Sequence, residues 1–310
     1  MIYAFQAVPE QLSKAFDIQR LRVLVEVARR GSVTAAAEEL RLSQPTVSLH
    51  VKALNMMLGV PVVERRGRGV RLTDAGRVLE EHARRALAEL ERAQEAMERH
   101  RGVAGGSLHL GAGTTPGTYL LPRLLGEFHA RHPDVDLRLE VASTSGIVEL
   151  IRRGELHLGV VGETAPHRDI EQRPLVRDRL VCIVPVAHAA AERGEITKRE
   201  LADATLLVRG AGSSSQAVTD RWLERSRLQP RSRWELDSPE AIKQAVAAGL
   251  GVAFVSELIV RDELQHGRLA AVGVESARLP ERTLDLVRSA GQGLSPPERA
   301  FIELLDERLP

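Results

Sequence analysis

Two patterns of apolar positions divide this chain. Through the first hundred residues, apolar side chains recur at spacings of three and four, which predicts amphipathic helices. After residue 107, short apolar runs alternate with amphipathic stretches, which predicts strands and helices in turn. The segment GVAGGS, residues 102–107, interrupts both patterns with glycine. A helical front part and an α/β rear part are therefore expected.

Three short helices and a hairpin are expected within residues 17–73. Asp17 can cap the first helix and Gly31 can end it, while Ser32 and Ser43 can cap the next two. A short turn joins the second helix to the third, and this arrangement predicts a helix-turn-helix. The segment VVERRGRGVRLT that follows is typical of strand, turn and strand, with arginines at the turn. Such a hairpin beside a helix-turn-helix is a wing.

The third helix has an apolar side, made by Val47, Val51 and Leu54, and a polar side with little charge. Short polar side chains suit the major groove of DNA, where they reach base edges, while neighbouring cations contact phosphates. About ten basic and five acidic residues between positions 18 and 76 favour a polyanion as partner. The candidate DNA-contact residues are Ser43, Gln44, Pro45, Thr46, Ser48, Leu49, Lys52, Arg65, Arg66 and Arg68. The alternative is a helical pair packed in an ordinary core.

One long helix, capped by Thr73, is expected over residues 74–101. Apolar and small side chains recur along it at spacings of four and three, and its other faces are rich in arginine and glutamate. A narrow apolar seam on a charged helix favours pairing with a second copy of the chain. The seam residues are Leu79, Ala83, Ala86, Leu90, Ala93 and Met97.

The rear part alternates strands with helices, which predicts parallel sheets. The expected strands are 107–113, 135–143, 156–162, 179–185, 205–210, 232–237, 250–256 and 282–289. The expected helices are 119–131, 146–153, 215–227, 239–248, 257–266 and 297–308.

Hydroxyl side chains follow three of these strands at the point where a helix begins. Open parallel sheets bind ligands at the carboxyl ends of their strands, and helix starts with free backbone donors favour anions. The sequence therefore predicts a site for a small anionic metabolite, a carboxylate or a phosphate ester. The candidate effector-binding residues are Thr114, Thr115, Thr144, Ser145, Arg209, Ser213 and Ser214. Alternatively, each hydroxyl is a simple helix cap.

Composition narrows the function further. The 310 residues carry a net charge of +1, and the one cysteine, Cys182, lies in an apolar run, so an internal disulfide is excluded and a reducing cytoplasm is favoured. No apolar run reaches the roughly 18 residues that cross a bilayer, so no membrane partner is expected. Nothing resembles a nucleophile, an acid–base pair or a set of metal ligands. We therefore expect no enzyme activity, no metal and no cofactor.

The stretch GSVTAAAEELRLSQPTVSLHVKALNMMLGVPVVERRGRGVRLTDAGRVL resembles the amino-terminal signature of the LysR-type transcriptional regulators. The positions in register are Ala36, Ala37, Leu40, Ser43, Gln44, Pro45, Ser48, Leu54, Leu58, Gly59, Glu64, Arg65, Leu72, Thr73, Ala75 and Gly76. Asn55 and Met56 replace the acidic pair usual in the family, and Leu49 stands where many members have a polar or basic residue.

The resemblance implies an α/β plus α protein of three parts. These are a winged helix-turn-helix domain at 17–73, a linker and dimerisation helix at 74–101, and a two-lobed, periplasmic-binding-protein-like effector domain at 107–310. Lobe one is expected at 107–176 and 271–310, and lobe two at 177–270. The order of the parts fits the family along nearly the whole chain.

The resemblance also implies a function. The chain is expected to bind double-stranded DNA as a homodimer that assembles into a dimer of dimers, with RNA polymerase as a further partner. A small anionic effector in the cleft between the lobes would modulate promoter binding. Residues 117–151 look similar to members that control carbon-fixation or sulfur-assimilation operons. The alternative is a small-molecule-binding protein or enzyme with an incidental helix-turn-helix domain.

Overall fold

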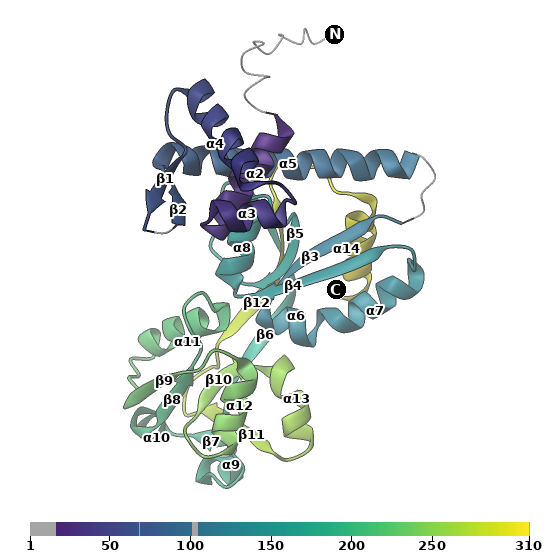
Figure 1. Ribbon diagram of the computed structural model, residues 1–310. Helices are drawn as coiled ribbons and strands as arrows, with labels where there is room; N and C mark the ends of the chain where they lie inside the picture. The colour runs from purple at the N-terminus through teal and green to yellow at the C-terminus, as the bar shows by residue number, and fades with distance from the viewer. Residues whose placement is uncertain (1–16, 68, 101–104, 310) are drawn as a thin grey trace. The chain divides into compact units, whose positions relative to one another are not determined.

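The computed structural model describes residues 17–67, 69–100 and 105–309, which form two compact units (Figure 1). Within these ranges, the structure contains no helix that combines the length and the apolar character needed to span a membrane.

The first unit consists of helices and one hairpin. Its elements are α2 (Ile18–Arg30), α3 (Val33–Glu39), α4 (Gln44–Leu58), β1 (Val63–Arg66), β2 (Gly69–Leu72) and α5 (Asp74–His100). The predicted caps are confirmed: Asp17, Ser32 and Ser43 each accept a hydrogen bond from a backbone N–H in the first turn of the helix that follows. Gly31 ends α2 with φ of 61°, a left-handed conformation that glycine adopts at little cost.

The core of the first unit collects the apolar sides of α2, α3 and α4. Val47, Val51 and Leu54 of α4 are buried against Leu24 and its neighbours on α2, as the apolar spacing predicts. Asn55, which departs from the family pattern, accepts a hydrogen bond from the backbone N–H of Val62 at 2.8 Å. This amide therefore fixes the start of the hairpin relative to the end of α4.

The second unit alternates strands with helices. Its elements are β3 (Ser107–Gly113), α6 (Thr114–Tyr119), α7 (Leu121–Arg131), β4 (Asp136–Ala142), α8 (Thr144–Arg152), β5 (Leu158–Gly162), β6 (Ile170–Pro185), α9 (Ala189–Arg193), β7 (Glu195–Ile196), α10 (Lys198–Asp203), β8 (Thr205–Val208), α11 (Ser214–Arg225), β9 (Ser232–Glu235), α12 (Pro239–Ala247), β10 (Ala253–Ser256), α13 (Glu257–Gln265), β11 (Leu269–Val274), β12 (Glu281–Ser289) and α14 (Pro296–Arg308).

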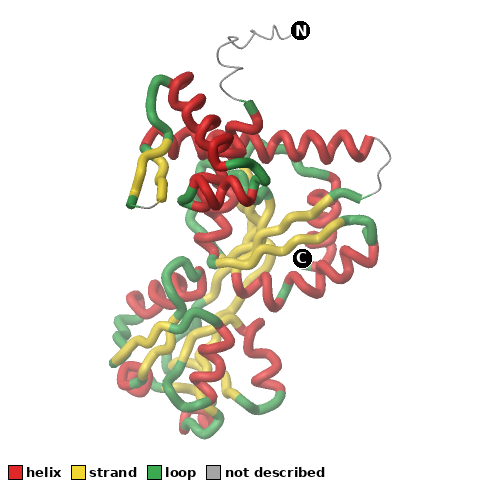
Figure 2. The backbone as a smooth tube through the Cα atoms, in the orientation of Figure 1, coloured by secondary structure: helices red, strands yellow, loops and turns green. Residues whose placement is uncertain are grey.

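The main sheet of this unit is mixed, so the prediction of purely parallel sheets is wrong in part. Its strand order is β4-β3-β5-β12-β6-β11-β7, and β10 pairs with β6. β3 pairs in parallel with β4 and β5, as predicted, but β12 runs antiparallel to both β5 and β6. The long β6·β12 ribbon passes between the two ends of the unit (Figure 2). Strand alternation along the sequence does not reveal the direction of a returning strand.

Four clusters of buried apolar residues lie in the described part of this unit, two toward each end of the β6·β12 ribbon. At one end, one cluster gathers Leu110, Phe128 and Phe301 with their neighbours, and at the other end one gathers Cys182 and Val272 with theirs. Burial raises the pKa of the Cys182 thiol to about 12, so the thiol stays protonated and behaves as a small apolar side chain.

The predicted start of the return to lobe one, residue 271, is wrong. β11 pairs with β6 at Ala271 and Val272, and Val272 and Val274 belong to the lobe-two core, so the chain returns later, within β12. The remaining domain limits stay predictions. The prediction also missed α6, β7, β11, α9 and α10 and the first half of β6, most of which are too short to show a periodic pattern.

Candidate functional site

The polar side of α4 is exposed in the first unit. Gln44, Pro45 and Lys52 are exposed, and the side chain of Leu49 is 66% exposed. Ser43 accepts a hydrogen bond from the backbone N–H of Thr46 at 3.2 Å, so its hydroxyl also serves as the helix cap. The alternative that this face packs in a core is therefore wrong for these side chains.

The hairpin that follows α4 also carries cations. Val63 pairs with Leu72 and Arg65 with Val70 in an antiparallel register. Arg65 and Arg66 are exposed and make no ion pair within the described part of the chain. Arg71, by contrast, bonds to Glu64 at 2.6 Å. Arg68, also a candidate for DNA contact, lies outside the described residues.

The seam of α5 is only partly covered within the first unit. Ala83 is buried and Leu79 is half-buried, but Ala86, Leu90, Ala93 and Met97 are exposed. The buried end of the seam borders an apolar groove of about 1100 Å³, a volume that includes the solvent at its mouth. The groove is lined by Leu21, Leu58, Val60, Val62, Ala75, Val78, Leu79, His82, Ala83 and Ala86. A groove with such a lining is typical of a protein interface.

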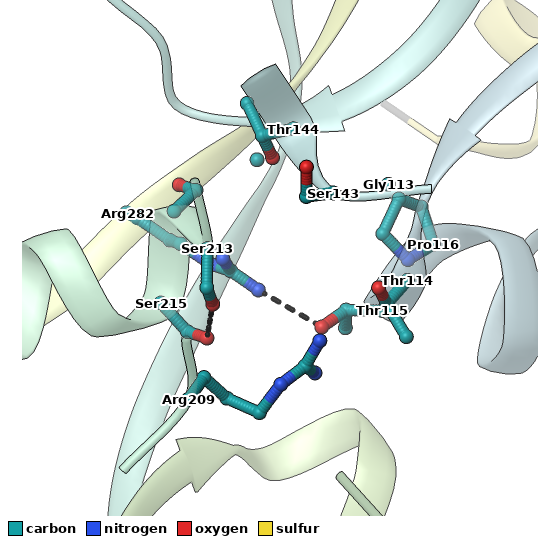
Figure 3. Close-up of a pocket in the computed structure, with 12 residues that line it drawn as sticks. Gly113, Thr114, Thr115, Pro116, Ser143, Thr144, Arg209, Ser213, Ser215 and Arg282 are labelled. Atoms are coloured by element: carbon teal, nitrogen blue, oxygen red, sulfur yellow. Dashed lines mark hydrogen bonds between the residues drawn. The ribbon is translucent and has the colours of Figure 1, made fainter. Parts of the chain in front are cut away.

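In the second unit, three loops meet at one polar cavity (Figure 3). They join β3 to α6, β4 to α8 and β8 to α11, so the carboxyl ends of three strands and the starts of three helices face the same space. The empty volume is about 290 Å³, including solvent at the mouth. The lining residues are Gly113, Thr114, Thr115, Pro116, Ser143, Thr144, Gly162, Arg209, Ser213, Ser214, Ser215 and Arg282.

Six of the seven predicted effector residues line this cavity, and Ser145 does not. Ser145 lies one residue further into α8, where its hydroxyl is 3.2 Å from that of Ser143. A Cβ built on Gly212 would lie 2.1 Å from the Ser145 hydroxyl, and the Ser145 N–H donates to the Gly212 carbonyl at 3.4 Å. Ser145 therefore joins the β4–α8 loop to the β8–α11 loop instead of facing the cavity.

Two of the cavity hydroxyls are helix caps, as the simpler alternative expects. Ser213 accepts a hydrogen bond from the backbone N–H of Gln216, and Ser143 accepts one from Gly146 at 3.1 Å. Thr115 is different, because its hydroxyl accepts a hydrogen bond from an Arg282 nitrogen at 3.2 Å. Helix capping therefore accounts for only some of the hydroxyl groups in the cavity.

Arg209 is the cation that the sequence pointed to. Its guanidinium points into the cavity (Figure 3), and its buried Nε has no hydrogen-bond partner. Burial lowers the pKa of Arg209, and nearby Asp237 opposes that shift, but no carboxylate within the described ranges forms an ion pair with it. A half-buried guanidinium with an unused donor is suited to a negatively charged ligand.

Arg282 is a second cation, which the sequence did not reveal. It lies on β12, is 5% exposed, and bonds through Nε to Asp178 of β6 at 2.8 Å. In the sequence, Arg282 is marked only by its place at the start of the predicted strand segment RTLDLV. Gly162 makes room for it, since a Cβ there would lie 2.7 Å from an Arg282 nitrogen and 2.6 Å from the Ser214 hydroxyl.

Two family models match the chain. "Bacterial regulatory helix-turn-helix protein, lysR family" matches residues 18–77, and "LysR substrate binding domain" matches residues 101–310.

Relatives of known name or structure match along most of the chain. A probable RuBisCO transcriptional regulator of Trichormus variabilis is 35% identical over 292 residues, which cover 92% of this chain and 86% of the relative. Full-length OxyR from Pseudomonas aeruginosa is 29% identical, with a TM-score of 0.71 and 95% and 94% of the two chains covered. The regulatory domain of CcmR from Synechocystis PCC6803, solved with 2-PG, is 29% identical, with a TM-score of 0.61 and coverage of 66% and 97%.

Proposed function

Because this chain belongs to the family of LysR-type transcriptional regulators, we propose that it controls carbon-fixation genes in response to a small anionic metabolite bound beside Arg209. The unpartnered, half-buried guanidinium of Arg209 in a cavity of hydroxyl groups carries the effector part of this proposal. The Trichormus variabilis relative, a probable RuBisCO transcriptional regulator, supports the part that concerns the regulated genes.

DNA binding belongs to the exposed face of α4 and to the hairpin. Gln44 would read an adenine edge through two hydrogen bonds, Ser48 would bond to either base type, and Leu49 would contact a thymine methyl group. Lys52, Arg65 and Arg66 would contact phosphates and set the register. All of these side chains except Ser48 are exposed, and Ser48 is half-exposed.

The effector would lie with its anionic head between Arg209 and the hydroxyls of Thr114, Thr115 and Ser213. The start of α11 adds backbone donors and a positive partial charge on the same side. A carboxylate or a phosphate ester suits this lining. The structural relative that holds 2-PG makes 2-phosphoglycolate the first compound to test.

Two copies of the chain would pair through the apolar groove and the exposed part of the α5 seam. Leu90 is 45% exposed and Met97 is 60% exposed, and a partner helix would remove both from water. Two such pairs would form the dimer of dimers. The regulator would act on promoter DNA in the cytoplasm, with RNA polymerase as a further partner.

Fluorescence anisotropy with labelled DNA tests this proposal. The full chain is titrated into DNA from upstream of its own gene and of a RuBisCO operon, at several salt concentrations, with and without 2-phosphoglycolate. We expect tight binding with a steep salt dependence, since each phosphate contact contributes a slope of about −0.9. The metabolite should change the affinity or the bend of the complex. Equal, weak binding to every DNA at low salt would contradict the proposal.

A further inference from the structure

We infer that Asp178 determines the charge of the effector that the cavity prefers, although it does not line the cavity itself. By cancelling Arg282, it leaves Arg209 as the one cavity cation that no described carboxylate pairs with. This inference rests on the proposed function, since it concerns the same effector site.

The Arg282–Asp178 pair is built into the β6·β12 ribbon. The two residues face each other in the strand register, and their side chains are 3% and 1% exposed. Arg282 Nε donates to Asp178 Oδ2 at 2.8 Å, and the hydroxyl of Ser256 donates to Asp178 Oδ1 at 2.6 Å. Because water is excluded here, the carboxylate acts on the guanidinium with little screening. The pair contributes almost no net charge to the cavity.

The Arg282–Asp178 pair also fixes the hydrogen-bonding role of the Thr115 hydroxyl. Arginine can only donate hydrogen bonds, so the Thr115 hydroxyl must accept the one from Arg282 at 3.2 Å. The hydroxyl proton of Thr115 is then free to donate to another acceptor. Thr115 lines the cavity, and an oxygen of a bound anion is an acceptor at that place. Arg282 therefore acts as a positioning residue that turns Thr115 into a donor for the ligand.

Arg209 is in the opposite situation. Its Nε is buried without a partner, and no described carboxylate forms an ion pair with it. An entering anion therefore meets one guanidinium that forms no ion pair with a described carboxylate, hydroxyl donors and the start of α11. Removing the Asp178 charge would add a second guanidinium without an ion-pair partner, at Arg282, and would favour a doubly charged head over a singly charged one.

The test compares two probes of the same skeleton and different charge. Phosphonoacetate and sulfoacetate differ by one negative charge when the phosphonate is fully ionised. Isothermal titration calorimetry on the full chain, at a pH where that holds, gives the selectivity ratio, which is Kd of sulfoacetate divided by Kd of phosphonoacetate. At an effective dielectric constant near 20, one added unit charge near the ligand should raise this ratio about tenfold in Asp178→Asn.

Ser256→Ala is the matched control. It removes the other hydrogen bond to Asp178 without changing any charge, so its ratio should stay within about twofold of wild type. An unpaired buried arginine is costly, so Asp178→Ser, which leaves space for water beside Arg282, is measured in parallel. Arg282→Gln should move the ratio in the opposite direction, because it leaves Asp178 as an uncancelled negative charge. Thermal melts establish which variants are folded.

The inference is supported if the selectivity ratio rises in Asp178→Asn and falls in Arg282→Gln. Equal weakening of both probes in these variants overturns it, because the pair would then be purely structural. The proposed function would still stand if Arg209→Gln weakened the binding of both probes. Failure of the wild-type chain to bind either probe would overturn the anion site and this inference together.

Discussion

Two regions of this molecule are suited to anions, and they differ in how they hold their charges. On the hairpin of the first unit, Arg65 and Arg66 are exposed to solvent and make no ion pair with any described residue. In the cavity of the second unit, Arg282 is buried and cancelled, and Arg209 is half-buried with an unused donor.

The difference follows from the two ligands. A DNA duplex presents many phosphates, so the binding free energy can be the sum of many weak, solvent-screened contacts. No single contact then needs an exact geometry. A small metabolite presents one or two charged groups, so each protein group must be desolvated and fixed in place by its neighbours. We therefore expect single substitutions to weaken DNA binding in small steps and effector binding in large ones.

The largest effect should come from truncating a core side chain on the buried side of α4, opposite its exposed face. Leu54→Ala removes a fully buried side chain from the first unit and should destabilise that unit by about 2–5 kcal/mol. Thermal unfolding followed by circular dichroism should show the loss. Effector binding measured by calorimetry at low temperature should survive, since Leu54 is not part of the second unit. Loss of effector binding in a folded second unit would break the separation of the two regions.

The second-largest effect should come from a substitution in the cavity of the second unit. Arg209→Gln removes the unpaired guanidinium and should weaken binding of 2-phosphoglycolate by about 1.5–3 kcal/mol, the usual range for a hydrogen bond to a charged group. Arg199→Gln is the matched control, because Arg199 is an exposed arginine of α10 that does not line the cavity. Unchanged calorimetric affinity in Arg209→Gln would remove this residue from the site.

A smaller pair of effects separates base reading from phosphate contact. Gln44→Ala should relax discrimination at one base pair by about 1–3 kcal/mol without changing the salt slope. Arg65→Gln should leave discrimination unchanged and lower the magnitude of the salt slope by about 0.9. Arg71→Gln, whose guanidinium already pairs with Glu64, should change the slope less. Anisotropy titrations on matched and single-mismatch DNA give both the base discrimination and the salt slope. If Gln44→Ala and Arg65→Gln changed the same one of these two quantities, base reading and phosphate contact would not be separate roles.

The smallest effect concerns the acid stability of the second unit. The backbone N–H and hydroxyl of Thr197, with Arg193, lower the pKa of Glu200 to about 2. A carboxylate with a depressed folded-state pKa stabilises the fold above its unfolded pKa, and that contribution is lost as the pH falls from about 4.5 towards 2. Melting temperatures at pH 7 and pH 3 should therefore fall less in Glu200→Gln than in wild type. An equal fall in both would mean that the Glu200 carboxylate adds no stability.

Local features of the first unit were predictable because the information is local. Asp17, Ser32 and Ser43 cap helices that begin one residue later, and Val47, Val51 and Leu54 follow the period of a single helix. The exposure of the face around Gln44 follows from the same period. Nothing in the chain's own sequence, however, shows that Val60 and His82 border the same groove, since they come together only by packing.

The cavity was predictable at helix starts and not elsewhere. Thr114, Thr144 and Ser213 each lie where a helix begins after a strand, so their place at one sheet edge could be expected. Arg282 lies 73 positions beyond Arg209, and only the antiparallel register of β12 with β6 brings it opposite Asp178. Ser145 does not line the cavity although Thr144 does, because a shift of one residue along a helix turns a side chain by about 100°.

The central claim is that an anion in the cavity of the second unit changes how the first unit binds DNA. Linkage requires that DNA then change the affinity for the anion by the same factor. The decisive measurement is the calorimetric Kd of 2-phosphoglycolate for the full chain, with and without saturating promoter DNA. The account predicts a change of about 5- to 150-fold, equal to the change in DNA affinity caused by the metabolite. Identical Kd values in both titrations would contradict it.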